Sequence, residues 1–162
     1  MIATSLLKTK LGTFVLHGNE QGITGISLPG TCPLPKKPAT ASPRHSAILD
    51  DAARQITEFV NGERTTFDLP LSVTGTQFQM RVWNIIQTIP FGHTLSYGEI
   101  GHRLGNKKMA RAVGGAANAN PVPLIIPCHR VIGANGRLTG FAGGLKMKKC
   151  LLTLEKEQLD ND

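Results

Sequence analysis

Apolar and polar residues alternate along three short segments at the start of the chain. These segments are residues 2–7, 13–17 and 23–28. Alternation with this period places the apolar side chains on one face of a strand, and Gly12 and Gly18 lie in the breaks. The pattern therefore predicts a small antiparallel sheet. Residues 29–43 follow with five prolines and two adjacent lysines, a composition that predicts a loop.

Beyond this loop the apolar residues recur every three or four positions, as they do on one face of a helix. Residues 46–61 show this spacing and are followed by Gly62, a typical residue just past the end of a helix. Residues 67–73 are a candidate strand before a break near Gly75.

The second half of the chain is predicted to be mainly helical. Helices are expected at residues 78–89, 107–118 and 145–156. Ser96 and Glu99 have the spacing of a capping box, which predicts a further short helix that ends at the turn Gly105-Asn106. Two short helices joined by a glycine turn resemble a helix-turn-helix, a pattern that is only moderately specific by itself.

Composition argues against a membrane-spanning or disulfide-stabilised protein. The 162 residues are 40% hydrophobic and 18% charged, and no apolar run approaches the roughly 20 residues that a membrane span needs. Residues 1–16 lack the pattern of a signal peptide. The three cysteines are odd in number and have no short pairing motif, so we expect free thiols and a cytoplasmic location.

Positive charge is concentrated in the second half of the chain. Residues 1–75 hold 7 Lys and Arg against 6 Asp and Glu, whereas residues 76–162 hold 11 against 5. Such an excess of cations fits a surface that neutralises phosphates, and an ordinary solvated basic face has the same composition. Charge alone therefore leaves both interpretations open.

The segment 111–117, with the sequence Arg-Ala-Val-Gly-Gly-Ala-Ala, is unusual for a helix. Each of its two adjacent glycines costs about 1 kcal/mol relative to alanine in a helix. A face of glycine and alanine lets another surface approach closely, and that surface is either a packed helix or a DNA groove. Arg111 either enters a base stack that a nucleotide has left or forms a surface salt bridge.

Cys128 is the candidate nucleophile. It follows residues 121–127, whose three prolines restrict the backbone, and it precedes His129. A thiol attacks as the thiolate, so we expect His129 to activate it and Glu155 to orient the imidazole. Asn120 is the candidate for holding the turn in place. The alternative is a buried structural cysteine near a satisfied histidine–glutamate pair.

Four motifs occur in a characteristic order and spacing. They are Ser96-Tyr97-Gly98-Glu99-Ile100, Arg111-Ala112-Val113-Gly114, Asn120-Pro121-Val122-Pro123 and Pro127-Cys128-His129-Arg130-Val131. Together they resemble the O6-alkylguanine-DNA alkyltransferase family, strongly over residues 76–156. The resemblance implies an α+β (α/β) fold with an N-terminal ribonuclease-H-like domain, 1–75, and a C-terminal winged helix-turn-helix-like DNA-binding domain, 76–162.

The resemblance also implies a function and a partner. The family repairs O6-alkylguanine in DNA by transferring the alkyl group to its own cysteine, here Cys128, in a single turnover. O4-alkylthymine is a further candidate substrate. The implied partner is double-stranded DNA, bound through the minor groove by a monomer, and the implied reaction needs no cofactor.

Individual roles follow from matching positions. Arg111 matches the residue that fills the vacated base stack, and Tyr97 matches a tyrosine that donates to the flipped guanine. The matched DNA contacts are Gln79, Gly98, Asn106, Ala112, Gly114, Gly115 and Ala134. The matched pocket residues are Tyr97, Val131, Phe141 and Ala142. Val131 and Ala142 are expected to present backbone donors to the base, and the Cys128 carbonyl is expected to accept from its exocyclic amine.

The chain departs from the family pattern at several positions. Phe141 and Ala142 stand where some members have tyrosine and serine, which leaves the tolerance for bulky alkyl groups open. Cys32, His17 and His45 do not reproduce the zinc ligands of some relatives, so we expect no metal.

Two other classes of protein compete with this assignment. A non-catalytic alkyltransferase-like protein would bind damage but lacks the nucleophilic cysteine. A redox-sensing helix-turn-helix regulator would use Cys128 as its sensor and Arg111 for operator binding, but the segment 111–117 offers almost no polar side chains for reading bases.

Overall fold

A three-stranded antiparallel sheet and one helix form the first of two units. The computed structural model describes residues 2–31, 34, 43–141 and 143–160, and the chain divides into residues 1–73 and 74–162. The strands are β1 (Ala3–Thr9), β2 (Gly12–Gly18) and β3 (Ile23–Ser27), in the order β1-β2-β3. The predicted sheet is thus confirmed.

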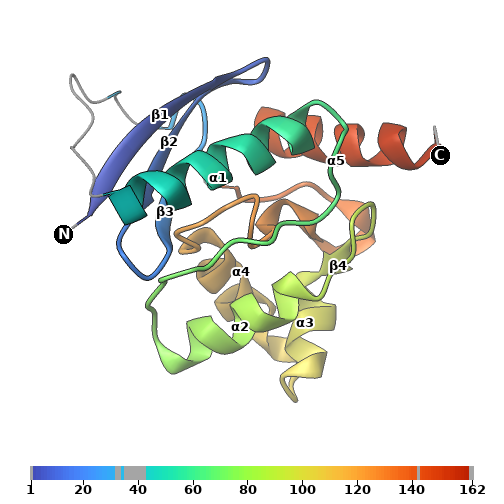
Figure 1. Cartoon of the computed structure of the whole chain (residues 1–162). Helices are drawn as coiled ribbons and strands as arrows, with labels where there is room; N and C mark the ends of the chain where they lie inside the picture. The colour runs from blue at the N-terminus through green and yellow to red at the C-terminus, as the bar shows by residue number, and fades with distance from the viewer. Residues whose placement is uncertain (1, 32–33, 35–42, 142, 161–162) are drawn as a thin grey trace. The chain divides into compact units, whose positions relative to one another are not determined.

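The helix of this unit, α1 (Pro43–Val60), covers one face of the sheet (Figure 1). Its apolar side meets the inward side chains of β2 and β3, and together they form a core of fully buried residues. Among these are Phe14, Leu16, Ile23, Ile56 and Phe59. The helix starts three residues earlier than the sequence predicts, while most of the proline-rich loop before it, including Cys32, lies outside the described residues.

The strand expected at residues 67–73 is not formed. Leu71 makes one isolated parallel bridge, in which the N–H of Ile23 donates to Pro70 and the N–H of Ser72 donates to Ile23, both at 2.8 Å. Pro70 has no N–H to extend a ladder, so the apolar pattern here gives a single bridge instead of a strand.

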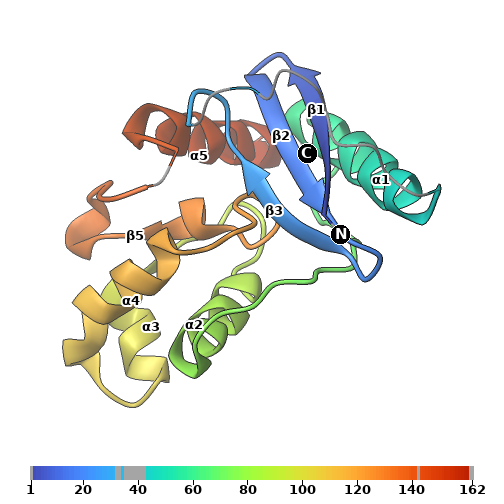
Figure 2. The same cartoon turned by 90° about the vertical axis from the view of Figure 1, so that its left-hand side faces the viewer.

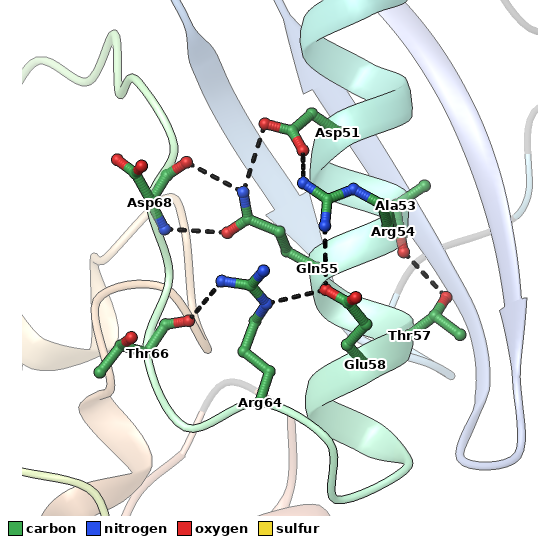
Figure 3. Close-up of polar contacts among 9 residues, drawn as sticks. All are labelled: Asp51, Ala53, Arg54, Gln55, Thr57, Glu58, Arg64, Thr66 and Asp68. Carbon is green, nitrogen blue, oxygen red and sulfur yellow. Dashed lines mark hydrogen bonds and ion pairs between the residues drawn. The ribbon is translucent and has the colours of Figure 1, made fainter.

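Gln55 holds the segment after α1 in place (Figure 3). Its side chain is 2% exposed and its amide donates to the carbonyl of Asp68 at 2.9 Å and to Asp51 at 3.2 Å. Its own carbonyl accepts from the N–H of Asp68 at 2.8 Å. Arg64 adds a link from the same segment to Glu58 on α1 at 2.9 Å. One amide therefore satisfies both backbone groups of Asp68.

The second unit is mainly helical (Figure 2). Its helices are α2 (Gln77–Gln87), α3 (Tyr97–Arg103), η1 (Lys107–Met109), α4 (Ala110–Asn118), η2 (Cys128–Arg130), η3 (Ala134–Gly136) and α5 (Leu145–Asp160). The expected capping box at Ser96 and Glu99 is present at the start of α3. α3 and α4 form the helix-turn-helix pair, and Trp83 of α2 donates to the carbonyl of Ala116 on α4 at 2.8 Å.

Two short strands in this unit were not expected from the sequence. β4 (Leu95–Ser96) and β5 (Val131–Ile132) pair in parallel, with Leu95 opposite Val131. Strands of two residues are too short to show an alternating pattern, so only the folded chain reveals them. Their pairing joins the start of α3 to the segment that directly follows Cys128.

The Gln55 network yields a prediction for stability. We expect Gln55→Leu to lower the free energy of unfolding by about 1–3 kcal/mol, because it leaves the N–H and carbonyl of Asp68 without partners. Arg54→Gln is the control, since it removes an exposed ion pair on the same helix and is expected to cost less than about 1 kcal/mol. Urea denaturation of both variants measures the difference, and equal losses would contradict the role of Gln55.

Candidate active site

The loop before Cys128 is held rigidly by Asn120. The Asn120 amide donates to the carbonyl of Ile126 at 2.8 Å, and its oxygen accepts from the N–H of Val122 at 3.0 Å. Between these two contacts lies Leu124, which is 1% exposed and has a φ of 79°. A side chain in the left-handed region costs on the order of 1–3 kcal/mol and persists only where surrounding contacts enforce it. The loop thus fixes the backbone immediately before the thiol.

Glu155 is the centre of the hydrogen-bond network behind Cys128. Its carboxylate, 1% exposed on α5, lies 2.5 Å from Nε2 of His129. It also accepts from Nε of Arg130 at 2.9 and 3.1 Å and from the N–H of Gly92 at 2.9 Å. Three separate segments of the unit therefore converge on one buried carboxylate.

The charges of this network follow from its contacts. Burial by itself would raise the pKa of Glu155, but the hydrogen bonds and positive charge supplied by His129 and Arg130 bring it below its ordinary value. Burial lowers the pKa of His129, against the opposing effect of Glu155. At neutral pH the site therefore holds a carboxylate, a guanidinium and a neutral imidazole.

A neutral imidazole bonded to Glu155 through Nε2 carries its proton on that nitrogen. Nδ1 of His129 is then the unprotonated nitrogen, and it is buried without a hydrogen-bond partner among the described residues. A buried acceptor is normally paired with a donor, so Nδ1 is positioned to bind a water or an incoming proton donor. Nδ1 is able to receive a proton directly or through one water.

The Cys128 thiol lies in an environment that favours its protonated form. Its residue is 6% exposed, and burial raises the pKa of the thiol to about 11. A hydrogen bond with Asn120 and the positive charge of Lys148 offset part of this rise. Because a thiol of this pKa is almost entirely un-ionised at neutral pH, removal of its proton has to be coupled to the reaction.

Lys148 is a site residue that the sequence analysis missed. The residue is fully buried on α5, and its ammonium donates to the carbonyl of Thr139 at 3.0 Å. Burial lowers the pKa of Lys148, and a negative charge on Cys128 acts in the opposite direction. The signal was present in the sequence, because Lys148 is spaced from Leu151 and Glu155 as on one helix face.

Tyr97, expected at the flipped base, contacts the same carbonyl as Lys148. Its hydroxyl donates to Thr139 at 2.9 Å, and Nζ of Lys148 lies 5.8 Å from the centre of its ring. Burial raises the pKa of Tyr97, with the hydrogen bond to Thr139 opposing the rise. The hydroxyl is therefore a proton donor at neutral pH, and it must leave Thr139 to donate elsewhere.

The glycines of α4 are not explained by packing within the chain. A Cβ atom built on Gly115 meets no other atom within 4 Å, and one built on Gly114 meets the Tyr97 ring at 3.7 Å, an ordinary contact distance. Arg111 and Ala112 are exposed, and no carboxylate of the described residues pairs with Arg111. The face of small residues thus remains open to an external surface.

The other expected DNA contacts lie at helix ends. The side-chain oxygen of Gln79 accepts from the N–H of Thr76 at 2.9 Å and so completes a capping box. The amide N–H groups of Gln79 are then the donors that its side chain can offer to DNA. The side chain of Asn106 accepts from the N–H of Lys108 at 2.9 Å and so caps η1. Gly98 lies in the first turn of α3, and Ala134 is exposed at the start of η3.

The backbone groups of Val131 and Cys128 that are expected to contact the base already form a hydrogen bond with each other. The N–H of Val131 donates to the carbonyl of Cys128, which closes the turn of η2. The N–H of Val131 is therefore not free for a base unless this turn opens, whereas the carbonyl of Cys128 keeps a second lone pair. Phe141 is half-buried, while Ala142 lies outside the described residues.

Among the residues that the structure describes, no three metal-ligating side chains come together. Within the same residues, no helix has the length and hydropathy needed to cross a membrane.

Comparison with known families accounts for both units. Residues 2–73 match the ribonuclease-like domain of 6-O-methylguanine DNA methyltransferase, and residues 77–157 match its DNA-binding domain. The chain is 41% identical over 155 residues to the methylated-DNA–protein-cysteine methyltransferase of Methanosarcina acetivorans, covering 93% of this chain and 96% of the relative. Its counterpart in Mycobacterium bovis is 40% identical over 162 residues, covering 100% and 97%.

Solved structures agree with these matches. The Mycobacterium tuberculosis O6-methylguanine methyltransferase has a TM-score of 0.81 and 38% identity, covering 98% of this chain and 94% of that chain. The Mycobacterium tuberculosis OGT in complex with DNA has a TM-score of 0.83 and 40% identity, covering 94% and 92%. The protein is therefore a DNA repair methyltransferase that uses a cysteine as the methyl acceptor. The chain belongs to the 6-O-methylguanine DNA methyltransferase family.

The Glu155 network yields a prediction with a defined pH dependence. Glu155→Gln is expected to lower the free energy of unfolding at pH 7 by about 3 kcal/mol, because it leaves the buried charge of Arg130 without its counterion. Glu157→Gln, on the exposed side of the same helix, is the control and should change it by less than about 0.5 kcal/mol.

The sign of the pH effect follows from the lowered pKa. Because the folded carboxylate has a pKa below 4.5, the unfolded chain takes up this proton first, and the stabilisation is lost as the pH falls through and below that value. Thermal denaturation from about pH 3 to 7 should therefore show a flatter acid limb for Glu155→Gln than for Glu157→Gln. Parallel limbs would show that Glu155 is not ionised in the folded protein.

Proposed function

We propose that Cys128 is the methyl acceptor and that each molecule reacts once. The carrying observation is the arrangement behind the thiol, in which Glu155 fixes Nε2 of the neighbouring His129 and leaves Nδ1 buried without a partner. This arrangement supplies a base whose orientation is set before substrate binds. The product is a thioether, which has no easy route back to the thiol.

The proposed reaction moves one proton and one alkyl group. The thiol proton passes to Nδ1 of His129, directly or through a water, and the sulfur attacks the carbon attached to O6 of guanine. The C–S bond forms as the C–O bond breaks, and the guanine leaves with a proton returned by the imidazolium. Tyr97 is proposed to donate a hydrogen bond to the departing base in place of Thr139.

Lys148 is proposed to stabilise the thiolate as it forms. At a pKa of about 11 the thiol is ionised only to roughly one part in ten thousand at pH 7. The buried ammonium of Lys148 lowers this cost because opposite charges interact strongly where water is excluded. Its hydrogen bond to Thr139 keeps the ammonium near the sulfur, so Lys148 acts on the acceptor through its charge.

DNA binding is proposed to place α4 in the minor groove of a duplex that contains O6-alkylguanine. The small residues Ala112 and Gly115, which are exposed, and Gly114, which is half-buried, give the close approach that a narrow groove requires. The unpaired Arg111 fills the stack that the flipped nucleotide leaves. A structure of the related Mycobacterium tuberculosis OGT in complex with DNA supports DNA binding as such. The chain is proposed to bind as a monomer. It is also proposed to act in the reducing cytoplasm, because Cys128 and Cys150 are free thiols.

The acceptor is tested by mapping the transferred methyl group. After incubation with a duplex oligonucleotide that contains O6-methylguanine, mass spectrometry is expected to find one methyl group per protein molecule on Cys128. Cys128→Ala should bind the duplex and acquire none, because the sulfur does the chemistry and contributes little to the groove contacts. Cys150→Ala, which removes the exposed thiol of α5, is the matched control and should react like the unchanged protein. A methyl group on Cys150 alone would overturn the assignment.

The open face of α4 gives a second test. Gly115→Ala is expected to raise the free energy of unfolding by up to about 1 kcal/mol, since alanine favours a helix and meets open space here. The same change should slow repair of duplex DNA while the reaction with the free base O6-methylguanine stays unchanged. Quenched time courses of alkyl transfer from both substrates measure the two rates. If Gly115→Ala repairs the duplex at the rate of the unchanged protein, a close approach of DNA at Gly115 is excluded.

A further inference from the structure

A hollow beside α3 lies apart from the acceptor thiol. Its volume is about 460 Å³, and it is lined by Ser96, Gly98, Glu99, His102, Arg103 and Lys107. All of these residues belong to the helix-turn-helix pair or its connection. Three of the six carry basic side chains, and no function has so far been assigned to them.

The cations of this hollow are not neutralised within the chain. Glu99 lies four residues before Arg103, a spacing at which helical ion pairs form readily. Its carboxylate instead accepts from the N–H of Ser96 at 3.2 Å in the capping box. Among the described residues, no carboxylate lies within ion-pair distance of Arg103 or Lys107.

The hollow is also continuous with the proposed DNA interface. Gly98 lines it, Asn106 directly precedes Lys107, and both are among the residues expected to contact DNA. The inserted helix α4 carries a single cation, Arg111, which is assigned to the base stack. Two further cations of this unit, Arg130 and Lys148, are buried and bonded internally. The charge that neutralises phosphates must therefore come from residues beside α4.

We propose that this hollow binds a phosphate of the DNA backbone next to the groove that α4 enters, an inference that rests on the proposed DNA binding. Arg103 and Lys107 neutralise the phosphate, and the imidazole of His102 donates a hydrogen bond to it. A guanidinium presents several N–H donors in a fixed plane that matches phosphate oxygens. The contact is indifferent to base sequence and to the lesion, because it involves the backbone alone.

The proposal predicts a change in the salt dependence of binding. Each neutralised phosphate releases condensed counterions, so the slope of log affinity against log salt reports the number of contacts. For the double variant Arg103→Gln, Lys107→Gln, which loses the one proposed phosphate contact, we expect this slope to decrease in magnitude by about 1 on an undamaged duplex. The control Lys8→Gln, Lys10→Gln removes the same charge from exposed positions on the first hairpin and should leave the slope unchanged.

The measurement is fluorescence anisotropy with an undamaged duplex between about 50 and 200 mM salt. Reaction of each variant with the free base O6-methylguanine, at the rate of the unchanged protein, shows that the acceptor site is intact. An unchanged slope in the Arg103, Lys107 variant overturns the proposal. Equal decreases in the two double variants also overturn it, because total charge would then be responsible.

The outcome is separable from that of the proposed function. Failure of the unchanged protein to acquire a methyl group on Cys128 would refute the acceptor assignment whatever the salt slopes show. A protein that is methylated on Cys128 but whose slope does not respond to Arg103 and Lys107 would refute the phosphate site alone.

Discussion

The contact between Glu155 and His129 is the interaction on which the acceptor site depends. An ionised carboxylate that is 1% exposed is tolerable only when its oxygens are well bonded, and here η2 and the turn at Gly92 contribute the donors to Glu155 of α5. The same bonds fix which nitrogen of His129 carries the proton. Folding of the second unit therefore also orients the base, because Arg130 and Gly92 hold the carboxylate to which Nε2 of His129 is bonded.

Before substrate arrives, the charged forms of the Cys128 thiol and of Lys148 are both disfavoured. Burial disfavours both the thiolate of Cys128 and the charged form of Lys148, yet each favours the charged form of the other. The thiolate therefore forms most easily while the neighbouring lysine is charged, because their attraction is little screened where water is excluded. Thr139 links this pair to Tyr97, since its carbonyl accepts from both Lys148 and the tyrosine hydroxyl. Movement of one donor necessarily alters the bonding of the other.

Much of the fold could be predicted from the sequence because its elements are long or well capped. The first three strands, the capping box at Ser96 and the principal helices all have clear periodic or capping signals. The segment 67–73 fails as a strand because Pro70 interrupts the ladder, and the pairing of β4 with β5 is too short to leave a pattern.

The candidate site could be predicted from the sequence only in part. The proximity of His129 and Glu155, 26 residues apart, is not dictated by spacing and was inferred from chemistry and family resemblance. Lys148 was missed because a lysine on a helix is normally solvated, although its spacing places it on the same helix face as Leu151 and Glu155. The internal bond between Val131 and Cys128 was also unforeseen, because a tight turn that uses its own donors leaves no sign in side-chain identity.

The protonated, nearly inaccessible state of Cys128 also bears on its chemical survival. Oxidants and small electrophiles in the cell react with exposed thiolates, and a sulfur oxidised beyond the sulfenic acid is seldom recovered. A thiol that is 6% exposed, with a pKa of about 11, offers these reagents almost no nucleophile. For a protein whose acceptor is used once, low reactivity at rest preserves the whole molecule for the lesion that it repairs.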